Sequence, residues 1–376
     1  MMATMAIGEA RSTTIGDHRR LACASLTDMY DRESDLFVFR VRRAGSSIVR
    51  EGTSARYTAI NLIGLAGERA EVVERVLHGS TVRNTAEHLV GRLELARNLG
   101  DLALIAWAGA AAGCATDRVW ARIVELGPDR STFPTVEIAW TLSALAADPA
   151  APAVLRERMC GRLLNACSAQ SGLFPHTIGH DHAAVRGHVS CFADLVYPIL
   201  ALSQHGMTAH DADAISCAAR AAEAVCRLQG PAGQWWWHYD YRTGKVIERY
   251  PVYAVHQDAM APMALFAAAK AARVNVDAAV AKGLRWLWSS PELGGGSLVD
   301  ADAGVIWRKV ARREPAKLSR YVQAAASRIS PALRAPSFFP PGAIDYEDRP
   351  YHLGWLLYAW PPARADRWSS GESDAS

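Results

Sequence analysis

The feature that most constrains the fold of this chain is a regular alternation between two kinds of helical segment. Six segments that begin near Ser54, Asp101, Thr135, His188, Val252 and Tyr351 are apolar on nearly all sides. The segments between them are amphipathic, with apolar residues at helical spacing and one charged face. A helix that is apolar all round is buried, whereas a helix with one charged face lies at the surface. The alternation therefore predicts an all-α fold of the α/α-toroid class, with an inner ring of six helices inside an outer ring of about six.

The same periodicity predicts the individual elements. We expect helices over residues 17–30, 55–66, 68–77, 81–98, 101–112, 117–126, 135–146, 152–169, 188–203, 209–228, 252–272, 276–288, 315–329 and 351–360. Residues 31–43 read as a turn and a short alternating strand, and residues 294–309 as a loop and hairpin, so short β-hairpins occupy the connections. One toroid domain is expected over residues 17–361, between a flexible N-terminus at 1–16 and a flexible tail at 362–376.

The composition narrows the class of protein. The 376 residues are half hydrophobic, and 41 Lys and Arg residues nearly balance 38 Asp and Glu residues, so no global charge favours a nucleic acid or a membrane surface. Seven cysteines include no C-x-x-C pair and read as small buried side chains in a reducing compartment. The chain shows neither a signal-peptide pattern nor an apolar run long enough to span a membrane. We therefore expect a soluble cytoplasmic protein, and nothing in the sequence specifies an oligomeric state.

The densest chemistry lies in residues 229–263, which hold three consecutive tryptophans, Trp235 to Trp237, among tyrosines, histidines and charged residues. A tight turn at Gly244 predicts a hairpin between residues 235–241 and 246–250, which Pro251 ends. The helix predicted from Val252 then carries a polar cluster in its first turns, where backbone N–H groups are unpaired and the helix dipole is positive.

One motif within this stretch resembles a known superfamily. Gln229, Gly233 and Trp235 are spaced as in the Q-x-x-x-G-x-W repeat of squalene-cyclase and prenyltransferase toroids, and residues 170–174 and 294–298 are degenerate copies. The alternation of helices also resembles the six-hairpin glycosidases. Both resemblances imply an α/α toroid, in which the motif ties a helix end to the next hairpin. The D-x-D-D acid motif of class II terpenoid cyclases is not present, because its nearest match, residues 300–303, ends in alanine. Nor do the residues assemble the zinc site of a protein prenyltransferase.

In such a toroid the starts of the inner helices point to one mouth, so the polar residues there should converge on a common cup. We expect catalytic acid–base groups from Asp258, His256, Asp194, Glu137 and Tyr253. Substrate-binding groups are expected from Arg56, Tyr57, Trp235, Trp236, Trp237, Arg249, Tyr250, Gln257, Arg349, Tyr351 and His352. Each of these residues has a simpler interpretation as a helix cap or a core residue, and the tryptophans have one as packing groups.

A histidine-rich loop offers a second kind of site. His176, His180, Asp181, His182 and His188 are of the residue types that bind zinc, but they lack the helical i, i+4 pairing or the distant third ligand of a specific motif. We interpret this loop as solvated. No metal and no cofactor are predicted.

Three functions remain open. Tryptophan together with polar groups at the mouth suits a small-molecule or oligosaccharide substrate, so the first hypothesis is an enzyme acting on a saccharide or uronate by hydrolysis, elimination or epimerisation. The second is a terpenoid-cyclase-like or prenyltransferase-like enzyme acting on a prenyl substrate. The third is a non-catalytic binding or scaffolding protein that keeps the fold.

Overall fold

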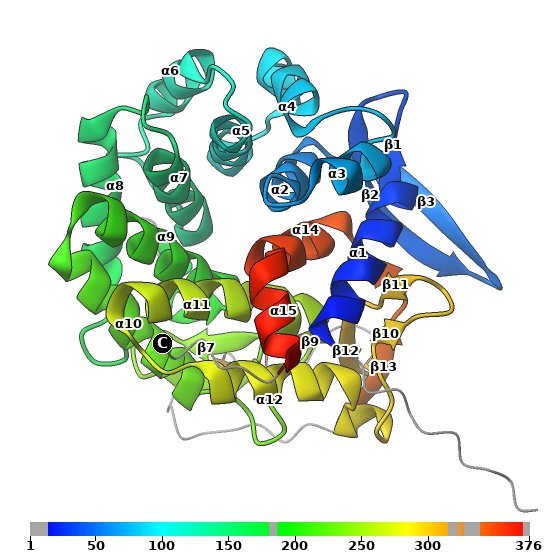
Figure 1. Cartoon of the computed structure of the whole chain (residues 1–376). Coiled ribbons are helices and arrows are strands. Elements are labelled where there is room, and N and C mark those ends of the chain that lie inside the picture. Colours follow the sequence, from blue (N-terminus) through cyan, green and yellow to red (C-terminus); the bar gives the residue numbers. More distant parts are fainter. Residues whose placement is uncertain (1–13, 180–185, 315–321, 323–324, 327–338, 371–376) are drawn as a thin grey trace, which may run out of the picture.

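Six helices form a closed inner ring in the described part of the chain (Figure 1). The structure is a computed structural model and describes residues 14–179, 186–314, 322, 325, 326 and 339–370. Around the ring, each inner helix packs against the next, and α14 and the segment before α11 close it. The inner helices are α2 (Ala55–Leu65), α5 (Leu99–Ala111), α7 (Thr135–Ala147), α9 (Ala193–Ala209), α11 (Ala261–Ala272) and α14 (Pro350–Ala359). The chain has the predicted α/α-toroid fold.

An outer layer of helices packs against this ring. It consists of α1 (Ile15–Met29), α3 (Ala70–Val76), α4 (Val82–Gly91), α6 (Asp117–Leu126), α8 (Ala153–Ala166), α10 (Ala212–Arg227) and α12 (Asp277–Trp288). Every described residue of α5 from Leu99 to Gly109 is buried, whereas α6 buries only Val119, Trp120 and Ile123. The apolar pattern of the sequence thus separates inner from outer helices because it determines which helices can lose contact with water.

Side-chain caps set where several helices begin. Ser54 accepts a hydrogen bond from Tyr57 N at 3.2 Å, and Asn98 accepts one from Asp101 N at 3.0 Å. The cap at Asn98 also explains why the helix predicted over 81–98 is divided. It ends at Gly91, a 3₁₀ turn follows at Leu93–Leu95, and α5 starts afresh at Leu99.

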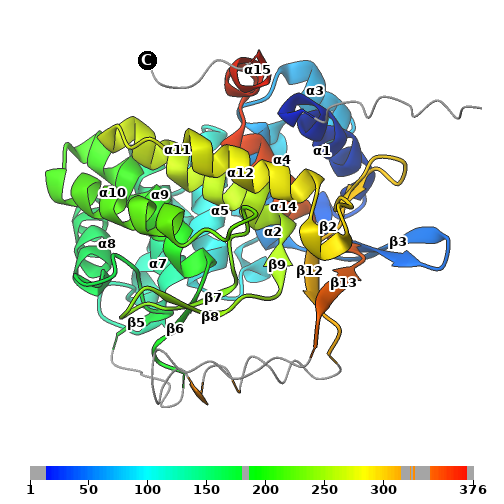
Figure 2. The same ribbon diagram turned by 90° about the horizontal axis from the view of Figure 1, so that it is seen from below.

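Many of the short strands lie on one face of the ring, and one hairpin projects from its side, as the second view shows (Figure 2). One sheet contains β1 (Tyr30–Asp31), β2 (Leu36–Ala44), β3 (Ser47–Thr53) and β14 (Glu347–Asp348), and a second contains β9 (Val252–Tyr253), β12 (Lys309–Arg312) and β13 (Pro341–Asp345). The third contains β6 (Val189–Cys191), β7 (His238–Asp240) and β8 (Lys245–Glu248). Two pairs, β4 (Phe133–Pro134) with β5 (Thr177–Ile178) and β10 (Val299–Asp300) with β11 (Val305–Ile306), complete the set.

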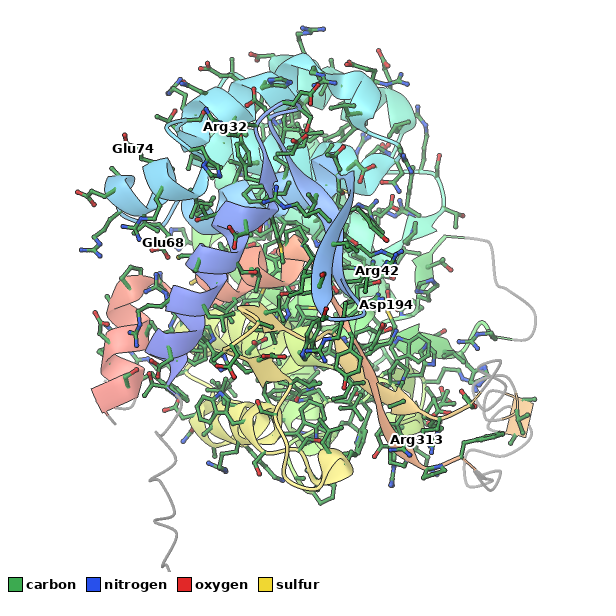
Figure 3. The ribbon with its side chains drawn as sticks, turned by 90° about the vertical axis from the view of Figure 1, so that its right-hand side faces the viewer. Arg32, Arg42, Glu68, Glu74, Asp194 and Arg313 are labelled. Carbon is green, nitrogen blue, oxygen red and sulfur yellow. The ribbon has the colours of Figure 1, made fainter. Side chains whose placement is uncertain are left out.

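The predicted strand at 31–43 is therefore one arm of a longer hairpin. β3 follows it, and Arg40 and Arg42 of β2 both pair with Glu51 of β3. Arg42 lies on this hairpin at the side of the molecule, and Glu68 and Glu74 lie at the neighbouring α3 (Figure 3). No local pattern predicts β3, because Ser47–Thr53 is mostly exposed and has no apolar alternation.

Three further boundaries differ from the prediction. Val252 and Tyr253 form β9, and the helix begins only at residue 254, because their backbones pair with Val310 and Lys309. Residues 256–260 then form a π-helical turn before α11. Residues 362–370, expected as a flexible tail, form α15 (Pro362–Ser370), whose Trp368 packs edge-on against Phe266 and Trp360. The helix predicted over 315–329 lies almost wholly outside the described residues.

The Q-x-x-x-G-x-W motif acts on the fold, as the resemblance implied. Gln229 Nε2 donates to the carbonyls of Ala279 at 2.8 Å and Gly233 at 3.0 Å, which joins the end of α10 to α12. Gly233 has a φ of +108°, and a Cβ there would come within 2.0 Å of the Lys282 carbonyl oxygen. Trp235 is fully buried against Gly283. The motif therefore holds two helices together and presents no group to a ligand.

Candidate functional site

A cavity of about 270 Å³ opens at the face where the inner helices begin. Its walls come from the first turns of α2, α7, α9 and α14, from the segment 253–260, and from the loops that carry Trp237 and Arg308. The lining residues are Arg56, Tyr57, Ile60, Val136, Trp140, Cys191, Phe192, Ala193, Tyr197, Trp237, Tyr253, His256, Met260, Arg308, Arg349 and Tyr351. Of the residues named from the sequence, this set includes Arg56, Tyr57, Trp237, Tyr253, His256, Arg349 and Tyr351.

Three guanidinium groups face this cavity, and each forms an ion pair with a carboxylate outside the cavity lining. Arg56 Nε donates to Asp101 at 2.6 Å. Arg349 bonds to Glu347 and donates to the Tyr57 hydroxyl at 3.0 Å. Arg308 pairs with the same Glu347 at 2.9 Å. Because a carboxylate fixes each guanidinium on one side, its remaining N–H groups are oriented in advance toward a ligand.

Glu347 is the anchor that the two guanidinium groups share. It is buried, and it also accepts a hydrogen bond from Arg40 Nη1 at 2.7 Å. Burial on its own would raise the pKa of Glu347, but the hydrogen bonds from Arg349 and Arg40 hold that pKa below its usual value. The carboxylate therefore stays ionised and keeps both arginines in place.

Arg308 carries the clearest sign of an unfilled hydrogen bond. Its Nε is buried and has no partner among the described residues. A buried donor without a partner costs about 1–3 kcal/mol, more for a charged group, so such atoms are uncommon unless a ligand satisfies them.

Aromatic rings supply the apolar part of the walls. Trp140 lies under the Arg56 guanidinium, 5.5 Å from it, and against Tyr197 at 5.0 Å between ring centroids. Tyr57 and Tyr351 pack at 4.9 Å. The half-buried Trp237 packs near Tyr253 on the opposite wall, at 6.2 Å. Ring faces beside charged donors are the combination that a sugar or another polar ring requires.

Two lining residues can transfer a proton to or from a substrate. Burial lowers the pKa of His256 to about 3, so its imidazole is neutral near pH 7. Burial also raises the pKa of Tyr253, so its phenol is protonated at the same pH. The two rings lie 5.0 Å apart between centroids, and Arg308 lies 5.4 Å from the Tyr253 ring. A proton acceptor and a proton donor therefore sit side by side next to an arginine.

Asp258, the first-named catalytic candidate, lies behind the cavity wall and does not line it. It is fully buried, and its Oδ1 is 2.7 Å from His352 Nε2. Its backbone carbonyl accepts a hydrogen bond from Trp360 Nε1 at 2.6 Å. The reason is helical geometry, because residues two apart point to opposite sides and His256 takes the cavity side. Gln257 likewise bonds to the Trp235 backbone, at 3.3 Å.

Asp194 and Glu137, the other two predicted carboxylates, also stand outside the set of lining residues. Asp194 is fully buried, accepts a hydrogen bond from Cys191 N at 2.8 Å, and pairs with His176 at 2.9 Å. Glu137 accepts a hydrogen bond from Gly100 N at 3.2 Å. Burial raises the pKa of Glu137, and the hydrogen bond from Gly100 opposes that rise. Both carboxylates join neighbouring segments at the rim.

The remaining binding candidates pack elsewhere. Trp235 is a core residue, and Trp236 stacks edge-on against Tyr250 at 5.8 Å and under Arg249 at 5.3 Å. Tyr250 donates to Glu292 at 2.9 Å. Sequence reasoning missed Trp140 and Arg308. Trp140 follows the predicted start of α7 by about one turn, whereas Arg308 reaches the cavity through strand pairing that no local pattern reveals.

Two further hollows adjoin this cavity. One of about 660 Å³ shares Arg56 and Tyr57 with it and extends along β3 and the start of α5. The other, of about 310 Å³, shares Cys191 and is also lined by His176, Arg186 and His238. The opening is therefore wider than one small ring.

Comparison with known proteins supports the fold. No family model matches this sequence, and no curated protein matches it. Among solved structures, unsaturated glucuronyl hydrolase from Bacillus sp. GL1, described as responsible for the degradation of glycosaminoglycan, superposes with a TM-score of 0.58 at 13% identity, covering 95% of this chain and 96% of that one. An alpha-1,6-mannanase of Salegentibacter sp. HEL1_6 gives 0.54 at 10% identity, covering 93% and 99%. A possible member of the GH105 family from Klebsiella pneumoniae gives 0.54 at 12% identity, covering 99% and 96%.

These likenesses establish the class of the molecule as an α/α toroid of the kind found in glycosidase-like proteins. Within the described residues, no helix has the length and hydrophobicity needed to cross a membrane.

Proposed function

We propose that this chain is an enzyme that acts on an acidic saccharide, bound with its carboxylate among Arg56, Arg308 and Arg349. The observation that carries the proposal is the convergence of three guanidinium groups and several aromatic rings on one cavity. Planar guanidinium groups bind carboxylates in a bidentate way, and aromatic faces stack on sugar rings. A hexuronate offers both features in one molecule.

Two of the structural neighbours bind saccharides, which supports the proposal. One was crystallised as a mutant with an oligosaccharide that begins in an unsaturated glucuronic acid residue, and another with a mannotriose. Because their sequence identity to this chain is low, the likeness supports a shared fold alone. The acidic character of the ligand is inferred from the arginines of this chain.

The lining favours one step of chemistry. In both elimination and epimerisation of a uronate, a base removes the proton from the carbon next to the carboxylate. Neutral His256 can accept that proton, and Tyr253 can donate one to the leaving oxygen or to the opposite face of the carbon. Arg308 and Arg349 would stabilise the negative charge that develops on the carboxylate. A substrate anion beside His256 would itself raise the proton affinity of the imidazole.

Hydrolysis by a pair of carboxylates has less support. It needs two carboxyl groups on either side of the scissile bond, and the described lining residues of the cavity include no Asp or Glu. Asp101 and Glu347, the carboxylates that pair with the lining arginines, are bound to those arginines. An uncharged polyene also has less support, because it needs a mainly apolar cavity and not three cations.

Binding separates this proposal from the alternatives. An oligosaccharide that ends in glucuronate should bind at least about tenfold more tightly than the matching neutral oligosaccharide, since a charged hydrogen bond contributes about 1.5–3 kcal/mol. Arg308→Ala should remove that difference, whereas Arg313→Ala, at an exposed position farther along the chain, should retain it. Equal binding of both sugars by the wild type, measured by calorimetry, would refute an acidic substrate. Tight binding without any product would support the third hypothesis, a non-catalytic binding protein.

A further inference from the structure

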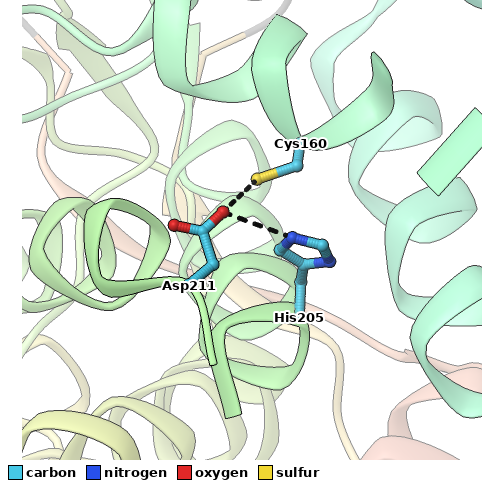
Figure 4. A group of neighbouring side chains, drawn as sticks. All are labelled: Cys160, His205 and Asp211. Carbon is cyan, nitrogen blue, oxygen red and sulfur yellow. Dashed lines mark hydrogen bonds and ion pairs between the residues drawn. The ribbon is translucent and has the colours of Figure 1, made fainter. Parts of the chain in front are cut away.

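Three potential metal ligands face one another at the end of α9 remote from the cavity (Figure 4). Cys160 lies on α8, His205 lies in the last turns of α9, and Asp211 is the N-cap of α10. Asp211 Oδ2 is 3.4 Å from His205 Nε2 and 3.6 Å from Cys160 Sγ. One ligand atom from each of the three residues lies within 4.8 Å of the other two.

The helix cap uses only one of the two oxygens of the Asp211 carboxylate. Its Oδ1 accepts a hydrogen bond from Ala214 N at 3.0 Å, which is the usual N-cap bond. Its Oδ2 points away from the helix start, toward the thiol and the imidazole. Oδ2 accepts its hydrogen bond from the Cys160 thiol at 3.6 Å, and loss of the thiol proton on metal binding would free this oxygen while the cap stays intact.

The imidazole of His205 lacks the hydrogen bonds that a buried histidine normally makes. The residue is 3% exposed, and its Nδ1 has no partner among the described residues. Its Nε2 lies 3.4 Å from Asp211, which is longer than the usual N–H···O distance of about 2.7–3.2 Å. A buried ring whose Nε2 makes no short hydrogen bond has room for a partner at the centre of the cluster.

Two of the three distances between the ligand atoms fit the edges of a zinc tetrahedron. Zinc binds His nitrogen at about 2.0–2.1 Å, carboxylate oxygen at about 2.0–2.2 Å and thiolate sulfur at about 2.3 Å. Tetrahedral angles then place nitrogen and oxygen about 3.4 Å apart, and sulfur and oxygen about 3.6 Å apart. The two distances in the cluster have these values before any rearrangement.

We propose that Cys160, His205 and Asp211 bind one zinc ion, with water in the fourth position. The mixed set of sulfur, nitrogen and oxygen ligands suits zinc, whereas magnesium and calcium prefer oxygen alone. Binding would replace the thiol proton of Cys160, which passes to solvent, by a sulfur–zinc bond. The Asp211 side chain is 29% exposed, which gives the ion and its water a route from solvent.

A second cluster of the same residue types does not meet these conditions. His176, Cys191 and Asp194 also lie within 4.8 Å of one another. There, however, Asp194 Oδ2 already accepts hydrogen bonds from His176 Nδ1 at 2.9 Å and Cys191 N at 2.8 Å. The imidazole nitrogen that faces the carboxylate is thus occupied by a normal hydrogen bond.

The proposed ion would join three elements of the toroid. Two of them, α8 and α10, belong to the outer layer, and the third, α9, belongs to the inner ring. Because α9 runs from the cavity at its N-terminal end to His205 near its C-terminal end, the site does not take part in the proposed saccharide chemistry. Its expected effect is on stability, because an ion that binds only the folded chain raises the free energy of unfolding.

Metal content and spectroscopy test the proposal on the whole protein. The purified chain, dialysed with zinc and then freed of loose metal, should retain one zinc per chain by mass spectrometry. Replacement by Co²⁺ should give the intense visible bands and the sulfur-to-metal charge-transfer band of a tetrahedral site with a thiolate ligand. EDTA should lower the Tm of the zinc-loaded protein.

Matched variants identify the ligands. Cys160→Ser should lose the charge-transfer band and weaken zinc binding by at least about tenfold, as losses at metal sites typically do. Cys226→Ser, which removes a half-buried thiol outside the cluster, should change neither. Should Cys160→Ser fail to fold, Asp211→Asn decides the question, because Asn keeps the helix cap but removes the charged ligand. Retention of zinc by Asp211→Asn at wild-type affinity, or a wild type that binds no stoichiometric Zn²⁺ or Co²⁺, would overturn the proposal.

Discussion

The guanidinium of Arg349 donates a hydrogen bond to the hydroxyl of Tyr57 across 3.0 Å, and this bond joins the last inner helix to the first. Arg349 precedes α14, and Tyr57 lies in the first turn of α2. Both residues also line the cavity. The contact that helps close the ring is therefore part of the candidate site, so changes to this region should affect stability and ligand binding together.

Glu347→Ala tests the anchor of these arginines. The substitution leaves Arg308, Arg349 and Arg40 without their shared carboxylate, and removal of one partner of a buried ion pair costs about 3–5 kcal/mol. We expect the free energy of unfolding, measured with urea, to fall by about that amount. Glu74→Ala, at an exposed position of α3, should change it by less than about 0.5 kcal/mol. Equal effects of the two substitutions would contradict the role of Glu347.

Tyr253→Phe tests the proposed proton donor. The change removes one hydroxyl that has no hydrogen-bond partner among the described residues, so the fold should stay intact. General acid catalysis contributes about 10²–10⁴-fold, and we expect kcat to fall by that factor with little change in KM. Tyr346→Phe is the control, because Tyr346 is exposed and packs against Trp307 outside the cavity. A rise in KM with kcat unchanged would show that Tyr253 binds substrate and transfers no proton.

His256 predicts how stability depends on pH. Its pKa is lowered from 6.5 to about 3 by burial, so the unfolded chain binds this proton first as the pH falls. The contribution of the neutral ring to stability is therefore fully present above about pH 6.5 and is lost progressively as the pH falls toward about 3. His256→Gln should show a smaller fall in the free energy of unfolding between about pH 7 and pH 5 than the wild type. The same fall in both proteins would exclude a buried neutral His256.

Two residues elsewhere also titrate in unusual ranges, with opposite signs. Burial lowers the pKa of His18 to about 4, and burial raises the pKa of Asp348 to about 7. A raised Asp pKa means that the folded chain keeps its proton longer, so this contribution to stability is lost as the pH rises toward about 7. Urea titrations of His256→Gln must therefore be compared with the wild type at each pH, so that the contributions of His18 and Asp348 to stability cancel.

Gly233→Ala tests the motif that ties α10 to α12. A methyl group there would meet the Lys282 carbonyl at 2.0 Å, and the backbone has a φ of +108°. We expect a loss of at least about 2 kcal/mol in the free energy of unfolding. Gly91→Ala is the matched control, because a Cβ at Gly91 meets open space near the end of α4. That change should be neutral or slightly stabilising.

The toroid could be predicted because hydrophobicity alone separates its two layers. A helix such as α5 must be buried whatever its neighbours are, and a helix such as α6 must keep one face in water. The cap Ser54 and the hairpin of β7 and β8 are likewise local features. The exposed strand β3 and the helix α15 depend on pairing and packing with distant segments, so no local pattern revealed them.

Residues of the candidate site could be predicted only where the position of a residue at a helix start determines the direction of its own side chain. Tyr253, His256 and Arg349 were named from their places at helix starts, and they line the cavity. Asp258 was named for its carboxylate, but it lies two residues from His256 and so points to the other side of the helix, toward His352. Arg308 could not be found, because it enters the cavity through the pairing of β12 with β9.

The central claim is that the cavity removes a proton from the carbon next to a sugar carboxylate. The most direct measurement is NMR of an oligosaccharide whose glucuronate carries a sugar at O4, the group that elimination would expel, incubated with the protein in D₂O. The account predicts loss of the proton signal at that carbon, through deuterium uptake or formation of a double bond, with the wild type and with Tyr346→Phe, and a much slower loss with His256→Gln. Cleavage of the glycosidic bond with that proton retained, or no change in any acidic saccharide that the protein binds, would contradict it.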